Sequence, residues 1–410
     1  MKKLTLLALV MLLAGVTGEV WSCTTFLMSG KHTPDGRPLL YKHRDTGTLD
    51  NALVYFNDGK YDYIGLVDSK ESWKRDVWGG FNAAGFAIMN SAAYNNNSGD
   101  TTKLADREGE VMKMALATCA TLADFEKMLN EMPKPVGVDA NFGVIDAHGG
   151  AAYYETGNFS WKKIDANDPA LAPFGLIIRT NYSFTGDPDI GYGYIRYETA
   201  SLALNMALAQ KKLDPQNLIN CISRNLSHSL TKENFRNDLP ESSADTRFRH
   251  IDDFITRTST ASAMLVVGAL PGEDPASTMM WTLVGFPLTT LAVPVWVSAG
   301  KTLPAAVSMK DNMHAPLCDA AMTLKNQLFP IKRGSGPKYM NVALLLNKEK
   351  TGILQKVESV EKEIFMKTAA LVAALPAKGK QQKEALLEHY KWLDGYITES
   401  YKELFGIEVK

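Results

Sequence analysis

Cys23 would carry both a nucleophile and a base if the chain were cut directly before it. Its thiol is the nucleophile, and a freed α-amine has an ordinary pKa of about 7.7–8.0, so it can accept a proton near neutral pH. General-base catalysis of acyl transfer requires such a base beside the nucleophile. The sequence holds seven histidines, and this chemistry needs none of them. The position of Cys23 therefore allows acyl transfer through a thioester, although a lipid anchor or an incidental cysteine at a processing site would occupy the same position.

Residues 1–22 have the three-part form of a secretory signal peptide. A charged start precedes an apolar run at 4–16, and small or polar residues follow up to Ser22. The apolar run is too short to span a bilayer, which needs roughly 20 residues. Cleavage after Ser22 would make Cys23 the first residue, whereas cleavage after Gly18 would leave four residues ahead of it. We expect export to the periplasm or the medium, with cleavage before Cys23.

A lipoprotein signal is the competing interpretation of the same segment. Cys23 would then be acylated and anchored, and the protein would bind ligands without catalysis. Bulky Trp21 and the polar residues between the apolar run and Cys23 weigh against this. The two interpretations exclude each other, because acylation of the α-amine removes the base.

A predicted hairpin after Cys23 returns charged side chains towards it. Residues 24–30 and 38–44 have strand character, and a Pro-Asp-Gly turn at 34–36 separates them. With this bend, Cys23 lies opposite residues 46–48. Three charged residues then end close to it, namely Lys42, Arg44 and Asp45. An acid can orient the terminal ammonium and a cation can lower the pKa of a thiol, although a solvent-exposed strand end would carry the same residues.

These motifs resemble the opening of the N-terminal-nucleophile (Ntn) linear amide hydrolases. The group includes choloylglycine hydrolases and penicillin V acylases, penicillin acyltransferase-like peptidases and dipeptidase A-type enzymes. Their opening runs Cys-Thr, a hairpin with Asp-Gly, then Arg-Asn-x-Asp, and this chain has Cys23-Thr-Thr, Asp35-Gly36 and Lys42-His-Arg-Asp45. Asp45 takes the acidic position and Lys42 that of the family's arginine. Lysine is a point charge and arginine a planar fork, so the catalytic cation stays open between Lys42 and Arg44.

Two later segments extend the resemblance. Residues 79–90 are similar to the family's Gly-Met-Asn-x-x-Gly-Leu-Ala segment, which precedes an oxyanion-hole residue; Asn90 and Ser91 are the candidates, with the register open up to Ala92. Asn181 matches the Thr-Asn motif in which a side-chain amide stabilises the oxyanion. A fixed N–H donor aimed at this oxygen contributes about 2.7–4 kcal/mol.

The resemblance also implies a later arginine near the nucleophile. Arg257 is the candidate, and Arg247 and Arg249 are equal alternatives. The fold that the family uses is an αββα sandwich of two stacked, mainly antiparallel sheets between helices. No metal or cofactor is implied, and no His/Cys spacing or Gly-rich loop in the sequence resembles a zinc or phosphate site.

The periodicity of the sequence favours the same α+β class. Helical spacing covers 108–131, with Cys119 on its apolar face, and 196–211, with a weaker pattern at 214–227. The strand-like runs are 24–30, 38–44, 85–91, 142–147, 151–156, 174–180, 261–269 and 280–297.

The end of the chain differs from the rest. Two apolar stripes, 353–364 and 386–404, flank a break after Pro376 and predict an antiparallel helical hairpin. We expect residues 23–345 to form the catalytic domain and 346–410 an extension packed on it. A dimer contact through the hairpin, and hence a homo-oligomer, stays open.

The charge composition of the chain argues against two classes of binding partner. Lys plus Arg number 44 and Asp plus Glu 45 in 410 residues, so the formal net charge is -1, and neither nucleic acid nor an anionic membrane is expected as a partner. No later segment is suited to span a bilayer, since the apolar run 282–297 is broken by two prolines. One disulfide among Cys119, Cys221 and Cys318 stays open.

The expected substrate is a small acyl-amide or a peptide. Bile-salt conjugates, penicillins, other N-acyl amines and peptides stay open, as does hydrolysis versus acyl transfer. Loops at 46–78 and 183–194 are expected to shape the pocket. Their aromatic residues and one neighbour favour an apolar acyl group: Tyr55, Phe56, Tyr61, Tyr63, Tyr182 and Phe184.

Overall fold

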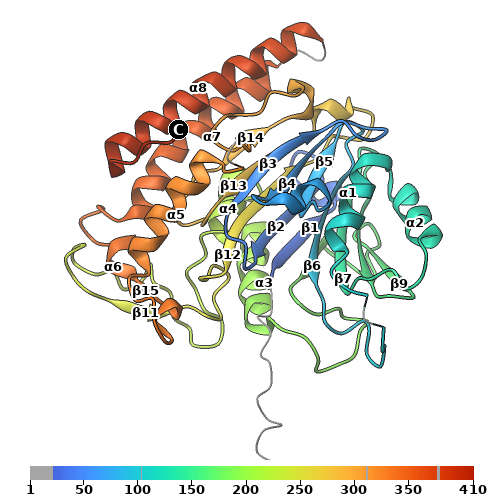
Figure 1. The fold of residues 1–410 in the computed structure, drawn as a ribbon, viewed down its shortest axis with the longest axis horizontal. Coiled ribbons are helices and arrows are strands. Elements are labelled where there is room, and N and C mark those ends of the chain that lie inside the picture. The colour runs from blue at the N-terminus through green and yellow to red at the C-terminus, as the bar shows by residue number, and fades with distance from the viewer. Residues whose placement is uncertain (1–21, 103, 311–312, 376–378) are drawn as a thin grey trace, which may run out of the picture.

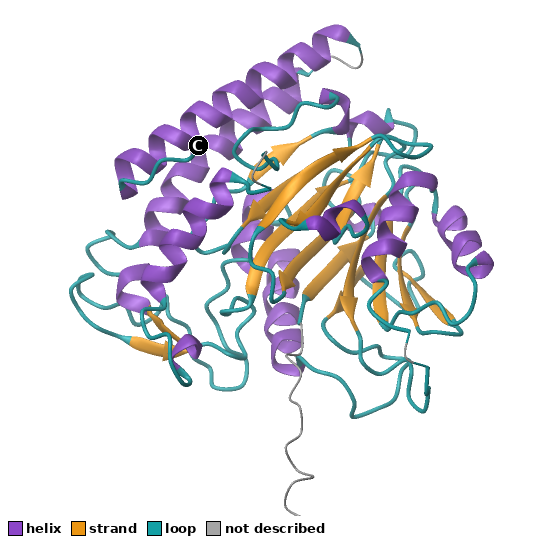
Figure 2. Ribbon diagram, viewed as in Figure 1, coloured by secondary structure: helices purple, strands orange, loops and turns teal. Residues whose placement is uncertain are grey.

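The computed structural model of this chain describes residues 22–102, 104–310, 313–375 and 379–410. Two antiparallel sheets form its centre and pack face to face, and helices cover their outer faces (Figure 1, Figure 2). The predicted αββα sandwich is therefore confirmed. Apart from Ser22, the predicted signal peptide lies outside the described residues.

The first sheet carries Cys23 at the start of one strand. Its order is β10 (Leu176–Arg179), β1 (Thr24–Met28), β2 (Leu39–Asp45), β12 (Thr260–Val267), β13 (Met279–Val284) and β14 (Val293–Val295). All neighbours are antiparallel. β2 lies inside the sheet and is buried along its whole length, so the charged residues at its end are buried as well.

The second sheet runs in sequence order, as an antiparallel meander. Its strands are β3 (Asn51–Phe56), β4 (Tyr63–Asp68), β5 (Gly79–Asn82), β6 (Ala87–Ala92), β7 (Ala140–Ile145), β8 (Ala151–Thr156) and β9 (Trp161–Asp165). Helices α1 (Glu108–Thr118) and α2 (Leu122–Glu131) pack on its outer face. A separate small sheet pairs β11 (Phe248–His250) with β15 (Tyr339–Asn341).

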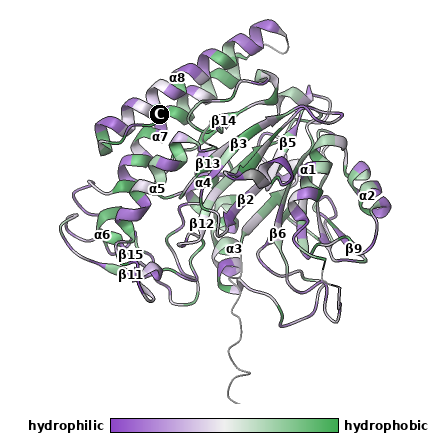
Figure 3. Ribbon diagram, in the orientation of Figure 1, coloured by the Kyte–Doolittle hydropathy of each residue, from purple (hydrophilic) through white to green (hydrophobic). Residues whose placement is uncertain are grey.

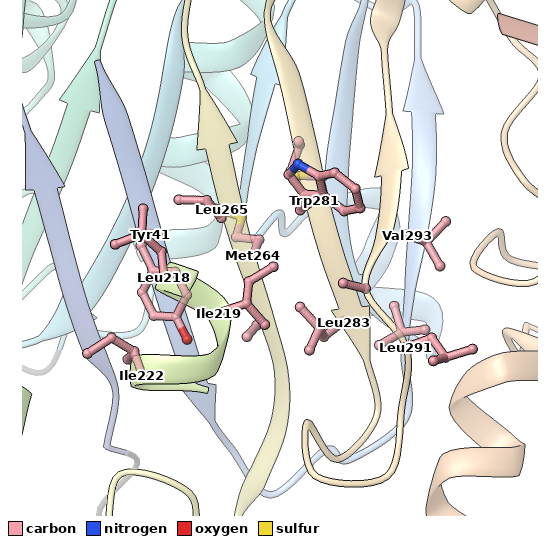
Figure 4. Packing of buried hydrophobic residues seen from close by; sticks show 14 of the residues in the cluster. Tyr41, Leu218, Ile219, Ile222, Met264, Leu265, Trp281, Leu283, Leu291 and Val293 are labelled. Carbon is pink, nitrogen blue, oxygen red and sulfur yellow. The ribbon is translucent and has the colours of Figure 1, made fainter. Parts of the chain in front are cut away.

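Helices cover the outer face of the first sheet. They are α3 (Tyr194–Ala209), α4 (Pro215–Ile222), α5 (Pro316–Leu328), α6 (Val342–Leu345), α7 (Ile353–Ala374) and α8 (Lys380–Phe405). Leu218, Ile219 and Ile222 of α4 lie near Tyr41 (Figure 4), in one buried cluster with the sheet. Among the helices described, none has the length and apolar character needed to cross a bilayer.

The C-terminal helices form the predicted hairpin. Hydrophobic and hydrophilic residues alternate along α7 and α8 (Figure 3), and their apolar residues join the core of the first sheet. Glu361 of α7 forms a fully buried ion pair with Arg224. The Trp281 and Phe365 rings lie 4.5 Å apart, and Tyr390 accepts a hydrogen bond from the backbone of Trp296 at 2.8 Å. The hairpin thus closes the core of this sheet.

Two predicted elements are each divided in the structure. The helix predicted over 108–131 is two helices, because Thr121 and Asp124 form a capping box that starts α2. Cys119 therefore caps the end of α1 and does not lie within a helix. The run at 280–297 is β13 and β14, separated by a turn.

Several elements lie where the sequence analysis expected loops. β3 and β4 lie within 46–78, one of the two segments assigned to pocket loops, and β5, β9 and α5 were not predicted. β9 is half-exposed and charged, so it lacks a strong alternation of apolar residues. α5 starts at Pro316, where proline is tolerated at the first helical position.

Candidate active site

Cys23 lines a cavity of about 480 Å³ between the two sheets and the start of α1. The residue is only 7% exposed. It directly precedes β1, so the strand pairing that fixes β1 also fixes the thiol. Ser22, the residue before it, lies beside Arg257, whose Nη2 donates to the Ser22 carbonyl at 3.4 Å.

The predicted register of the first hairpin is wrong. Extended by one residue from its last pair, the observed register sets Cys23 against Arg44 and not against 46–48. The centre of the connection lies earlier than the predicted bend, because a 3-10 turn at Gly30–His32 begins soon after β1. The charged end of β2 nevertheless lies beside the nucleophile.

Alternation along β2 divides its last four residues between two faces. Lys42 and Arg44 face the second sheet, where their side chains bind polar groups. His43 and Asp45 face Thr256 and Arg257, in the segment before β12, and Thr260 at its start. The predicted catalytic residues therefore lie on both faces of the first sheet.

Lys42 is a buried cation in the cavity wall. Its Nζ donates to the Trp78 carbonyl at 2.7 Å and to Asn90 Oδ1 at 2.6 Å, and within the described residues it has no ion-pair partner. Burial lowers its pKa to about 8, whereas the charge of an ionised Cys23 acts in the opposite direction. This ammonium can stabilise negative charge in the cavity.

Arg44 lines the same cavity but is already engaged. Its Nη1 donates to Asp68 at 2.7 Å and to Asn51 at 3.0 Å. The guanidinium also lies 4.7 Å from the centre of the Trp78 ring. Of the two predicted cations, Lys42 is therefore the one without an anionic partner.

Asn90 presents an amide nitrogen to the cavity. Lysine can only donate, so its bond from Lys42 fixes Oδ1 on the side of Lys42. The Nδ2 group must then point the other way, and no hydrogen bond from it is found in the described part of the chain. Asn90 lines the cavity and is 5% exposed. Ser91, the alternative candidate, accepts a bond from Asn141 instead.

Asp45 is held by Arg257 and Thr260. Arg257 donates to Oδ2 through Nη2 at 2.5 Å and Nε at 3.0 Å, and the Thr260 hydroxyl donates to Oδ1 at 2.6 Å. The same Arg257 reaches the carbonyl of Ser22, so the pair lies against the bond predicted to be cut. The other two candidate arginines form ion pairs with carboxylates elsewhere: Arg247 and Arg249.

Arg196, on α3, is the residue that the sequence analysis missed. Its guanidinium donates to the Cys23 carbonyl at 2.6 Å, to the Thr24 hydroxyl at 2.9 Å and to Asn181 Oδ1 at 2.8 Å. Burial lowers its pKa, and the nearby Arg257 adds to this effect. No motif marks it, because it lies within an ordinary helix far from Cys23 in sequence.

Asn181 lies one layer behind the cavity. The side chain is fully buried and does not line the cavity wall. Its Nδ2 donates to the carbonyl of Ala92 at 2.9 Å, and its Oδ1 accepts from Arg196. The donor at one end and the acceptor at the other fix the orientation of this amide.

Two further buried bases surround Asp45. Burial lowers the pKa of His43 to about 4, so it is neutral at working pH, and its Nδ1 has no hydrogen-bond partner among the described residues. Lys325 donates to the carbonyls of Thr258 at 2.5 Å and Thr260 at 3.5 Å. Burial lowers the pKa of Lys325 to about 7. Lys325 thus braces the segment that binds Asp45.

The cavity wall is richer in charge than the sequence analysis expected. The predicted aromatic residues do not line it; Phe56 and Tyr63, for example, are buried in the core between the second sheet and α1. The aromatic residues that do line it are Trp78 and Tyr94. Its charged residues are Lys42, Arg44, Asp45, Asp68, Lys70, Asp106, Glu108 and Asp139.

In the part of the chain that the structure describes, one group of residues has spacing suited to a metal ion. The ligand atoms of Asp50, His314 and Asp319 lie within 4.8 Å of one another, but these residues do not line the Cys23 cavity. All four cysteines are unpaired. The disulfide left open among Cys119, Cys221 and Cys318 is therefore not formed in this structure.

Comparison with solved structures finds amide hydrolases. One is the Caenorhabditis elegans ortholog of N-acylethanolamine-hydrolyzing acid amidase, with 14% identity and a TM-score of 0.40 over 62% of this chain and 95% of that one. Another is penicillin V acylase from Agrobacterium tumefaciens, with 14% identity and a TM-score of 0.38 over 67% and 86%. A conjugated bile acid hydrolase from Clostridium perfringens has 9% identity and a TM-score of 0.40 over 67% and 92%.

Penicillin V acylases are among the enzymes whose opening motifs the sequence of this chain resembles. A scan against models of protein families and a search of curated proteins find no match for this chain. At such low identities and TM-scores, the similarity does not assign a function. The geometry of the site is therefore the basis for a functional proposal.

Proposed function

We propose that this protein is an exported Ntn hydrolase that cleaves linear amide bonds with Cys23 as its N-terminal nucleophile. The observation that carries the proposal is the set of groups around Cys23. Lys42 and Asn90 share its cavity, while Asp45 and Arg257 lie against the Ser22–Cys23 bond. A buried thiol with a cation, an amide donor and an oriented carboxylate suits acyl transfer.

The first step is attack of the Cys23 sulfur on the amide carbonyl carbon. The α-amine of the same residue takes the thiol proton and passes it to the leaving amine as the carbon–nitrogen bond breaks. Asp45, held by Arg257 and Thr260, orients the resulting ammonium. The product of this step is a thioester on Cys23 and a free amine.

Negative charge on the carbonyl oxygen is stabilised by the side-chain amide of Asn90. Lys42 holds that amide in place and adds its own positive charge. Asn181 acts indirectly, because its Nδ2 donates to the carbonyl of Ala92 and so fixes this residue in the cavity wall. In the second step the α-amine removes a proton from water, whose oxygen attacks the thioester carbon. The carbon–sulfur bond then breaks, the acid is released and the α-ammonium returns the proton to the Cys23 sulfur. Attack by an amine instead would make the enzyme an acyltransferase.

The burial of Cys23 favours this proposal over a lipid anchor. An acylated terminus must extend away from the protein to reach a membrane, whereas Cys23 is buried and its carbonyl is bound by Arg196. We also propose that residues 1–22 are removed on export and that residues 346–410 extend a catalytic domain formed by 23–345.

Turnover by residues 23–410 on a panel of acyl-amides tests the proposal. We expect hydrolysis that rises through the titration of the α-amine near neutral pH and disappears in Cys23→Ala. The Cys221→Ala variant is the matched control, because this thiol lies outside the cavity, and it should retain turnover. Hydrolysis that survives in Cys23→Ala would refute the proposal.

A further inference from the structure

The charges in the Cys23 cavity are unevenly paired. Arg44 pairs with Asp68 at 2.7 Å, Lys70 lies 3.8 Å from the same carboxylate, and Asp45 pairs with Arg257. Within the described ranges, the remaining charged residues of the wall form no ion pair. They are one cation and three carboxyl groups: Lys42, Asp106, Glu108 and Asp139.

Two of the three carboxyl groups, those of Glu108 and Asp139, are held by backbone hydrogen bonds, but the negative charge of the group is not balanced. Glu108 is the first residue of α1 and is 8% exposed. Its Oε1 accepts from the Asp139 backbone at 3.1 Å, and Asp139 accepts from the backbone of Asn96 at 3.1 Å. Burial raises the pKa of Glu108 to about 7, with Asp106 and Asp139 adding to the effect, and burial also raises that of Asp139. A cation placed here would relieve this repulsion.

A second feature of the same cavity indicates a ligand. The Nδ2 of Asn90 lies in the wall, with no hydrogen bond among the residues described, although the side chain is more than nine-tenths buried. An amide nitrogen that opens into a cavity can donate to a bound molecule. The oxygen of a bound molecule would accept this hydrogen bond. The cavity therefore has a donor suited to a carbonyl near Cys23 and carboxyl groups suited to a cation near α1.

The cation is better explained as an organic ammonium than as a metal ion. A metal ion needs its ligand atoms close together, and the group of described residues that meets this spacing is Asp50, His314 and Asp319, not the carboxyl groups of the cavity. An ammonium group can be held by carboxylates that lie further apart, each through its own hydrogen bond. The acidic wall also shares its cavity with the nucleophile, so both can contact one substrate.

We propose that the amide substrates of this protein carry an ammonium group, which Glu108 binds with Asp139 and Asp106 while the scissile carbonyl meets Cys23 and Asn90. This rests on the function proposed above and names its substrate class. The competing interpretation gives Glu108 only a structural task, as the acidic residue in the first turn of α1. A change in stability alone would fit that interpretation, whereas a change in substrate selectivity would not.

Paired substrates test the proposal on residues 23–410. Each pair is an acyl anilide whose chain ends in an ammonium group and the anilide of the same length that ends in a methyl group. We expect kcat/KM to favour the ammonium member at least about tenfold, as a charge-assisted hydrogen bond allows, and Glu108→Gln to remove most of this preference. Glu110→Gln is the matched control: Glu110 lies on the same helix but pairs with Arg107 outside the cavity, so the preference should persist.

Calorimetry with the Cys23→Ala variant separates this proposal from the proposed function. The ammonium anilide should bind this variant more tightly than its methyl partner, and adding Glu108→Gln should abolish the difference. Equal binding of both members, or a preference that survives Glu108→Gln, would overturn the proposal even if amides are hydrolysed. Binding of calcium or magnesium that depends on Glu108, without a preference for ammonium, would overturn it in favour of a metal site. If the wild type hydrolyses no amide, the function fails while the binding result still decides on the ammonium site.

Discussion

Replacing Arg196 with methionine tests whether its guanidinium positions the nucleophile. The change removes donors to the Cys23 carbonyl, the Thr24 hydroxyl and the Asn181 amide. Hydrogen bonds to charged groups contribute about 1.5–3 kcal/mol each, but the substitution also removes a costly buried charge. We therefore expect the free energy of unfolding to fall by less than the sum of the three bonds, about 3–5 kcal/mol. A misplacement of the thiol by about 1 Å should lower kcat roughly 10²-fold.

The assay compares kcat, KM and unfolding midpoints of three variants. Arg196→Lys should fall between wild type and Arg196→Met, because one ammonium cannot replace a fork that reaches three acceptors. Arg224→Met is the matched control: this arginine is equally buried and pairs with Glu361, so stability should fall while kcat of the folded protein persists. Wild-type kcat in Arg196→Met, or an equal loss of kcat in Arg224→Met, would refute the positioning role.

Three further substitutions test how individual buried charges affect turnover and the stability of the fold. Lys42→Met should lower kcat but leave Tm at neutral pH unchanged or higher, since burial lowers the pKa of this lysine to about 8 and thus disfavours its charged form. In the wild type, stability should correspondingly rise as pH increases above about 8, where the unfolded lysine still binds a proton that the folded one has lost; a flat profile would contradict this. Asp45→Asn should shift the acid limb of the pH–rate profile to lower pH, because the carboxylate no longer favours the α-ammonium, and an unshifted limb would exclude that contact. Glu361→Gln should cost about 3–5 kcal/mol in urea unfolding by leaving Arg224 unpaired, and an unchanged midpoint would show that the hairpin is not part of the core.

The part of the site nearest to Cys23 could be predicted from sequence because it lies on one hairpin. Lys42 and Asp45 are brought back by local strand pairing, and alternation along the strand then decides which face each occupies. The register was harder to predict, since the 3-10 turn at Gly30–His32 shifts the centre of the connection. This shift in the register of β1 and β2 changes which residue lies opposite Cys23. Lys42 and Asp45 nevertheless remain close enough for their side chains to reach the surroundings of the thiol.

Arg196 and the acidic wall could not be predicted in the same way. Arg196 reaches Cys23 only because α3 packs on the first sheet, a long-range contact without a local signal. Glu108 is an acidic residue in the first turn of a helix, a place where acidic residues are favoured for reasons unrelated to a site. Its place in the cavity depends on how α1 packs against the second sheet, and therefore on β4, which lies in a segment expected to be a loop, and on β5, which was not predicted.

Mass spectrometry of the exported protein, before and after brief reaction with an acyl-amide substrate, tests the central proposal most directly. The mature chain should begin at Cys23 with an unmodified α-amine, and the reaction should add one acyl group, on the Cys23 sulfur, that hydroxylamine removes. A chain that begins elsewhere, a lipid-modified terminus or an acyl group on another residue would contradict the account.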